Sequence, residues 1–451
     1  MDIKNKATQI ELFSLKSVQM RTFHTTWFTF FLAFFGWFGI APLMAIVRED
    51  LMLTKTQIGN TIIASVAITV AVRIFIGPLC DRIGARKAYT WLLILGSIPV
   101  MGIGLAHDYQ TFLLFRLAIG AIGASFVITQ YHTSVMFAPN CVGTANATTA
   151  GWGNLGGGVT QMVMPIIFTA ILSLGVNEYL GWRLAMIIPG IALFIMGFVY
   201  YFTTQDAPDG NYSELFKQDQ IDKGKGKGME SFNLAIKDYR VWALFFIYAA
   251  CFGVELTINN IAALYYHDHF KLDVQTAGVI AGLFGLMNIF ARTVGGFFSD
   301  FFAKKMGLKG RVVFLFIVLL GEGIMLMLFS RMSVMIAAIG TMIVFSLFVQ
   351  MSEGATFGLV PFINRKALGA VAGIVGAGGN AGAVAAGFLF RAENLTTQQA
   401  LLFLGVMVVI VSFATLLVRF SPAVQDAEKK AFAAALAEKQ RLKAGSGYEP
   451  I

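Results

Sequence analysis

The chain has 451 residues, of which 57% are hydrophobic and only 13% are charged, and its mean hydropathy is +0.71. A soluble protein needs about a quarter of its residues charged, so this composition excludes a soluble globular protein, and 42 Phe against 3 Cys exclude collagen-like, disordered and disulfide-rich chains. The net charge of +9 is typical of a membrane protein with Lys and Arg in its cytoplasmic loops, and we expect no nucleic-acid partner.

Continuous apolar segments long enough to cross a bilayer follow one another along the chain. They must be helical, because lipid offers no partner to a free backbone N–H or C=O group. Their apolar runs also differ from the alternating pattern of a β-barrel strand. We predict twelve transmembrane helices in an all-α membrane protein, at about 25–47, 58–80, 89–106, 111–136, 144–174, 183–203, 240–266, 275–303, 311–330, 332–358, 367–390 and 398–420.

Basic residues gather in one set of loops: before the first span and after the second, eighth and tenth spans. The positive-inside rule places these loops and both termini in the cytoplasm. We expect the protein to be embedded in the lipids of the plasma membrane, a bacterial inner membrane. An Ala/Glu/Lys-rich stretch at about 427–443 predicts a surface helix. The predicted organisation is a cytoplasmic N-terminal segment (1–24), a six-helix half (25–203), a cytoplasmic linker rich in Lys and Gly (204–239), a second six-helix half (240–420) and a cytoplasmic tail (421–451).

An Arg-x3-Gly-x3-Asp pattern followed by basic residues occurs in both the second and the eighth span. A spacing of four residues places the three side chains on one helix face, about 6 Å apart per step. The arginine then lies deep in the membrane, the glycine permits close helix approach, and the aspartate marks the cytoplasmic end. The patterns begin at Arg73 and Arg292, and we interpret the residues that follow as a conformational loop motif: Gly77, Asp81 and Arg82 in one half, Gly296 and Asp300 in the other.

A second pair of matching segments lies in the fifth and eleventh spans. Residues 151–158 read GWGNLGGG and residues 376–382 read GAGGNAG, so that Asn154 aligns with Asn380. Two repeats in register predict two pseudo-symmetric halves that arose by duplication. The glycines fit close helix packing, whereas a membrane-buried amide needs partners. The residues expected to shape the signature and gating contacts are Gly151, Gly153, Gly156, Gly157, Gly379, Asn380 and Gly382.

Arg73 and Arg292 have mostly apolar flanks, and each lies two turns inside its predicted helix end. Burying a guanidinium group costs about 2.5–3.5 kcal/mol on insertion scales, so a function or a partner must compensate. One possibility is that each pairs with a distant carboxylate. The other, which we favour, is that one arginine from each half faces a central cavity and attracts an anion. The planar fork of arginine matches a small trigonal oxyanion and keeps its charge on desolvation.

Several aromatic residues lie at comparable depth in neighbouring spans. Collectively they suit a narrow and mostly dry pocket, although any one of them also fits a lipid-facing or core position. These residues are Phe34, Phe35, Trp37 and Phe38 in the first span, Phe126 in the fourth, and Tyr248 and Phe252 in the seventh.

At this point the chain resembles the major facilitator superfamily. Residues 77–87 (GPLCDRIGARK) resemble its loop motif, and Arg116 to Gly120 resemble its fourth-helix motif. Within the superfamily, AGWGNLGGGVTQ (150–161) and GNAGAVAAG (379–387) are similar to the paired signatures of the nitrate/nitrite porters, closest to the branch of type I NarK and plant-type high-affinity transporters. The resemblance implies that Arg73 and Arg292 grip nitrate, that Asn154, Tyr248 and Phe252 line the site, and that Phe126 stacks on the anion.

Importing nitrate against an inside-negative potential costs about 2.3 kcal/mol per 100 mV. Uptake therefore needs cotransported protons or exchange for an internal anion such as nitrite. Intramembrane acids are present, and Glu255 lies one turn beyond Phe252. Our hypothesis is proton symport with Glu255 or Glu353 as the proton carrier, and Arg116 either pairs with such an acid or anchors a helix end. The alternative for each acid is a structural hydrogen bond.

Three other functions compete with nitrate symport: nitrate/nitrite antiport, transport of another small anion, and nitrate sensing without transport. We expect no enzyme activity, because no nucleophile–base pair or nucleotide-binding loop is visible. No metal site and no resident cofactor are expected either, since the five histidines are scattered. Whether an accessory protein is needed is left open.

Overall fold

The computed structural model describes residues 5–138, 141–215, 227–364, 367–422 and 424–426. Within these residues, twelve helical segments are long and apolar enough to cross a membrane, as predicted. The first six are α1 (Val18–Phe38) with α2 (Met44–Asp50), α3 (Lys55–Ile83), α4 (Ala85–Gly102), α5 (Tyr109–Gly120) with α6 (Ser125–Met136), α7 (Val142–Ser173), and α8 (Glu178–Ala185) with α9 (Ile187–Thr203).

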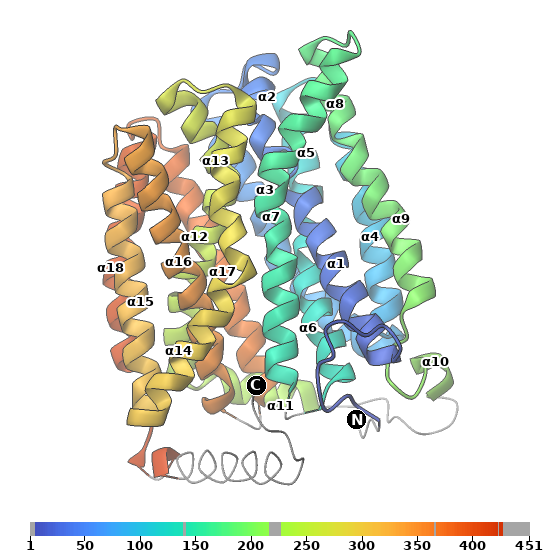
Figure 1. The fold of residues 1–451 in the computed structure, drawn as a ribbon, viewed down its shortest axis with the longest axis vertical. Coiled ribbons are helices and arrows are strands. Elements are labelled where there is room, and N and C mark those ends of the chain that lie inside the picture. Colours follow the sequence, from blue (N-terminus) through green and yellow to red (C-terminus); the bar gives the residue numbers. More distant parts are fainter. Residues whose placement is uncertain (1–4, 139–140, 216–226, 365–366, 423, 427–451) are drawn as a thin grey trace, which may run out of the picture.

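The second six segments follow two short helices, α10 (Tyr212–Leu215) and α11 (Lys227–Ile236). They are α12 (Tyr239–Phe270), α13 (Val274–Leu286) with α14 (Ala291–Met306), α15 (Leu308–Phe329), α16 (Met335–Leu359), α17 (Leu368–Arg391) and α18 (Thr397–Ser412). The helices form one upright bundle, with α10 and α11 at one end and α2 and α8 at the other (Figure 1). We call these ends the linker side and the far side. The predicted surface helix at 427–443 and residues 216–226 of the linker lie outside the described residues.

The first helix begins earlier than expected, at Val18 rather than near residue 25. The Ser17 hydroxyl caps it by accepting a hydrogen bond from the Met20 N–H at 3.2 Å. The added turns are buried, because Phe23 packs edge-on against Phe137 and Trp152. Polar residues in this stretch made the helix look shorter in the sequence than it is. One of its faces stays buried toward the linker side.

Glycines of the repeated signatures make the same close contact in both halves. A Cβ atom added to Gly156 on α7 would overlap the backbone of Phe31 on α1, and one added to Gly382 on α17 would overlap the backbone of Ala249 on α12. Each glycine lies two residues after the signature asparagine. The packing role expected for these glycines is therefore visible in both halves, as duplication of a six-helix unit requires.

The start of the linker is fastened to the turn between α3 and α4. Gly84 adopts a positive φ of 87° at this turn, and a Cβ atom there would collide with the Asp206 carboxylate. Asp206 is buried and accepts hydrogen bonds from the backbone N–H of Arg86 (2.9 Å) and Tyr212 (3.1 Å). Only glycine allows both the backbone conformation and the approach of the carboxylate at this point.

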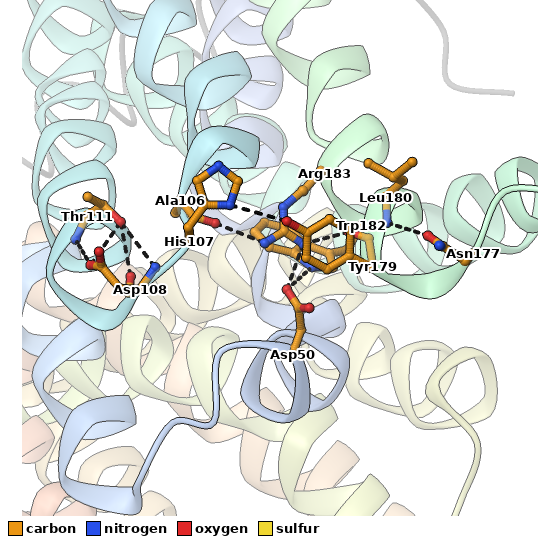
Figure 2. Close-up of polar contacts among 10 residues, drawn as sticks. All are labelled: Asp50, Ala106, His107, Asp108, Thr111, Asn177, Tyr179, Leu180, Trp182 and Arg183. Atoms are coloured by element: carbon orange, nitrogen blue, oxygen red, sulfur yellow. Dashed lines mark hydrogen bonds and ion pairs between the residues drawn. The ribbon is translucent and has the colours of Figure 1, made fainter.

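On the far side, the first half is closed by a buried ion pair (Figure 2). Arg183 Nη1 lies 2.6 Å from Asp50 Oδ2, and the Trp182 indole N–H donates to the same oxygen at 3.1 Å. The second terminal nitrogen of Arg183 donates to the Ala106 carbonyl at 2.9 Å. The guanidinium group also lies over the Tyr179 ring, 3.9 Å from its centroid. This cluster joins α2, the loop before α5, and α8.

We expect Asp50→Asn and Arg183→Gln each to destabilise the protein by about 3 kcal/mol, because removing one partner leaves the other charge buried without compensation. Unfolding of the detergent-solubilised protein measures the effect, and the double variant should lose less than the sum of the single losses. The control is Asp268→Asn, which breaks the pair of Asp268 with Arg48, whose side chains are 41% and 28% exposed, and should cost less than about 1 kcal/mol. Equal losses in Asp50→Asn and Asp268→Asn would contradict this account.

Candidate functional site

Five of the six predicted binding residues meet through a continuous set of contacts at the centre of the bundle. Arg73 on α3 lies over the Phe126 ring, 5.2 Å from its centroid, and Phe126 is 6.4 Å from Phe252. Phe252 stacks on Tyr248 at 5.2 Å, and the Tyr248 hydroxyl is 3.4 Å from Arg292 Nη2. The two arginines come from different halves. They therefore flank one aromatic cluster, as a site between the halves requires.

Arg73 is held by backbone carbonyls. Its Nη1 donates to Gly376 O and its Nη2 to Gly123 O, both at 3.2 Å, while its Nε is buried and has no partner in the described part of the structure. Gly123 lies in a 3-10 turn (Ala121–Ala124) that separates α5 from α6. Within the described part of the chain, no carboxylate lies within ion-pair distance of Arg73. The positive charge of Arg73 is therefore available to an anion.

Arg292 differs from Arg73 because it pairs with a carboxylate. Glu353 on α16 forms an ion pair with its Nη2, and both side chains are buried. Its Nη1 is buried and has no hydrogen-bond partner among the described residues. Within these residues, the possibility of a distant carboxylate thus applies to Arg292 and not to Arg73. An anion that binds Arg292 must compete with Glu353.

Glu255, one turn beyond Phe252, is bonded to amides from both halves. Asn154 on α7 donates to one carboxylate oxygen at 3.3 Å, and Asn288 donates to the other at 2.9 Å. Asn288 lies in a 3-10 turn (Met287–Ile289) between α13 and α14. Asn288 was not among the predicted site residues, although an amide in an apolar segment indicates a buried polar contact. Glu255 thus couples the sixth predicted binding residue, Asn154, to the second half.

Asn380, the counterpart of Asn154, is fully buried, yet neither its amide nitrogen nor its oxygen has a hydrogen-bond partner in the described structure. It follows Gly376 by one helical turn and so shares its helix face. The Gly376 carbonyl on that face accepts from Arg73. Asn380 therefore offers an unused donor and acceptor close to the first arginine.

The remaining signature glycines divide into two groups. A Cβ atom on Gly153 or Gly379 would overlap an aromatic ring within its own half, that of Phe30 or Phe252. Gly151 and Gly157 instead face the other half. Their added Cβ atoms would lie 3.2 Å from the Asn288 carbonyl and 3.1 Å from the Asn259 amide nitrogen. These two glycines let α7 approach the second half next to the site.

The two halves are tied together on the far side. Arg48 at the end of the first span binds both carboxylate oxygens of Asp268 at the end of the seventh, at 2.5 and 2.9 Å. Lys55 at the start of α3 donates to the Ala392 carbonyl just after α17, at 2.8 Å. These contacts hold the far side closed above the site.

Glycines of the loop motif and of α17 face open space within the described residues. A Cβ atom added to Gly77 on α3, to Gly296 on α14, or to Gly373 or Gly376 on α17 would meet nothing within 4 Å. The backbone at Gly296 is nevertheless closely approached, because a Cβ atom added to Gly354 on α16 would lie 3.2 Å from the Gly296 nitrogen.

The other motif residues lie away from the central cluster. Asp300 pairs with Arg311 on α15, Arg82 is exposed, and the side chain of Asp81 lies outside the described part of the structure. Arg116 on α5 donates to Asn260 at 2.7 Å, and within the described residues it forms no ion pair with an acid. Within the described residues, Arg116 is therefore bonded to a neutral amide of the other half and not to an acid.

Known proteins place this arrangement in a family. The sequence model of the Major Facilitator Superfamily matches residues 26–364. The chain is 42% identical to "High affinity nitrate transporter 2.5" of Arabidopsis thaliana, with 93% of this chain and 84% of that protein covered. It is 30% identical to "Nitrate/nitrite transporter NrtP" of Picosynechococcus sp., with 80% and 83% covered.

A solved structure supports the fold independently. A bacterial homologue of the human lysosomal transporter Spinster, in an inward-facing and unoccupied conformation, superposes with a TM-score of 0.70 at 17% identity, covering 91% of this chain and 100% of that one. At this identity the likeness concerns the fold alone. Together with the family match and the relatives, it shows that this chain is an integral membrane protein of the major facilitator superfamily and belongs to its nitrate/nitrite porter family.

Proposed function

We propose that this protein imports nitrate by proton symport, with alternating access around Arg73 and Arg292. The observation that carries the proposal is the meeting of these two arginines, one from each half, at a single aromatic cluster. Relatives named as nitrate transporters support nitrate as the anion. Nitrite is an expected second substrate, since one relative is named a nitrate/nitrite transporter.

The site favours a small planar oxyanion over a bulky one. Guanidinium forks present parallel donors that match the oxygens of a trigonal anion. Within the described residues, the unpartnered donors on the two arginines are Arg73 Nε and Arg292 Nη1, and the Asn380 amide nitrogen adds another. Aromatic rings occupy much of the remaining lining, so a phosphate ester would find neither the extra donors nor the room it needs.

Coupling to protons follows from the pairing of Arg292 with Glu353. While Glu353 is ionised, it occupies the guanidinium group that the anion needs. Protonation of Glu353 removes that competitor, so a bound proton favours nitrate and bound nitrate favours the proton by the same factor. Nitrate/nitrite exchange needs no such acid, and the Arg292–Glu353 pair therefore favours symport over antiport. Glu255, held by neutral amides, is the second candidate proton carrier.

Orientation gives this cycle its direction. By the positive-inside rule, the linker side faces the cytoplasm. The two halves are then tied together on the outer side by Arg48–Asp268 and Lys55. Rocking of the halves around the arginines would break these contacts and open the far side.

Proteoliposomes test the proposed function directly. We expect an inward proton gradient to drive nitrate uptake into empty vesicles, because symport needs no internal anion. Uptake that appears only in nitrite-loaded vesicles without a gradient would establish exchange and refute symport. If neither condition moves nitrate while a different anion is taken up, the substrate assignment is wrong.

Substitution of either arginine should weaken nitrate binding severely. A hydrogen bond to a charged group contributes about 1.5–3 kcal/mol, so Arg73→Gln and Arg292→Gln should each raise the Kd for nitrate by about 10- to 100-fold. Calorimetric titration of purified protein measures the change. Arg311→Gln, which removes a guanidinium group from the second half outside the site, serves as the control. A nitrate affinity unchanged in Arg73→Gln would exclude the central site.

Neutralising Glu353 should separate binding from coupling. Because Glu353→Gln no longer competes as a carboxylate, we expect it to bind nitrate and to exchange it across the membrane, but to lose accumulation driven by a proton gradient. The matched control is Glu322→Gln, another buried glutamate of the second half, which has no ion pair within the described residues. If Glu353→Gln still accumulates nitrate, while Glu255→Gln does not, the proton carrier is Glu255.

A further inference from the structure

Arg116 on α5 is a third buried guanidinium group that the central site does not use. It is 1% exposed. Its Nη2 donates to the Asn260 side-chain oxygen at 2.7 Å, its Nη1 to the Trp37 carbonyl at 3.5 Å, and its Nε is buried without a partner. Both acceptors are neutral, and no carboxylate within the described residues lies within ion-pair distance. Its full positive charge is thus buried with only partial compensation.

The partner of Arg116 belongs to the other half of the protein. Along α12, Asn260 follows Phe252 by eight residues, a rise of about 12 Å toward the far side. Asp268, which closes the far side with Arg48, follows another eight residues on. The contact between Arg116 and Asn260 therefore lies between the central site and the closed far side, on the route that an anion must take from outside.

Further unsatisfied polar groups surround this level of the interface. Asn259 is buried, and neither polar atom of its side chain has a partner among the described residues; the same holds for the Gln161 side-chain oxygen. Gln161 reaches from α7 across the interface to donate to the Asn259 carbonyl at 2.6 Å. A layer built only for permanent packing would satisfy such groups or replace them with apolar residues. This layer instead leaves donors and acceptors without partners within the described residues.

We propose that Arg116 is a second anion-binding position, which receives the transported oxyanion on the far side before it reaches Arg73 and Arg292. Asn260 and the anion bind the Arg116 guanidinium group alternately. Asn260 binds it while the far side is closed, and a small monovalent oxyanion binds it once the halves separate. This inference rests on the proposed function, because it takes the far side as the external side and nitrate as the anion.

The test is the initial rate of nitrate uptake into cells that lack their own nitrate transporters, normalised to folded protein in the membrane. We expect Arg116→Gln to raise the KM by about tenfold or more while the maximal rate changes little, because a charge-assisted contact on the way in is lost. Arg116→Lys, which keeps the charge, should restore much of the affinity. The matched control Arg183→Gln removes a buried guanidinium group of the same half and should lower folded protein without raising the KM.

Substitutions at Asn260 keep Arg116 in place and decide the question even if Arg116→Gln does not fold. Asn260→Asp puts a competing carboxylate on the guanidinium group and should raise the KM, whereas Asn260→Ala frees the group and should leave the KM unchanged or lower. Equal increases in both, or no increase in Asn260→Asp, would overturn the inference. Absence of nitrate uptake by the unaltered protein would instead refute the proposed function.

Discussion

A guanidinium group buried in a membrane bundle must find a negative charge or a set of oxygen acceptors, and the architecture of this protein follows from how each one does so. Arg183 has a permanent carboxylate partner and fastens the far side of the first half. Arg292 has a carboxylate partner that a proton can neutralise. In the described part of the chain, Arg73 and Arg116 donate to neutral oxygens. Under the proposed function, the first kind of arginine holds the fold and the others handle the anion.

The scaffold is close to symmetric, whereas its chemistry is not. Gly156 and Gly382 make equivalent helix contacts in the two halves, so duplication accounts for the frame. The signature asparagines have diverged: Asn154 donates to Glu255, but Asn380 has no partner within the described residues. The two carboxylates that contact site residues in the described structure, Glu255 and Glu353, belong to the second half. We infer that the first half supplies a fixed positive charge and that the second half supplies the group that responds to protons.

The sequence predicted the features that depend on composition and spacing. Twelve apolar segments follow from length and hydropathy, and the paired motifs placed Arg73 and Arg292 at the same depth in two halves. It could not predict the carbonyl acceptors of Arg73, because a backbone oxygen at Gly123 or Gly376 has no side-chain signature. The partner of Arg292 was hidden for a different reason, since 61 residues separate it from Glu353 in the chain and only tertiary packing joins them.

The proposed coupling of nitrate to protons depends on one claim, that nitrate and the Glu353 carboxylate compete for Arg292. This claim can be tested by calorimetry of nitrate binding to the purified protein at one pH in buffers with different ionisation enthalpies. We expect nitrate binding to take up protons, because nitrate displaces the Glu353 carboxylate from Arg292 and favours its protonation, and this uptake should disappear in Glu353→Gln. Nitrate binding with no proton uptake at any pH would contradict it.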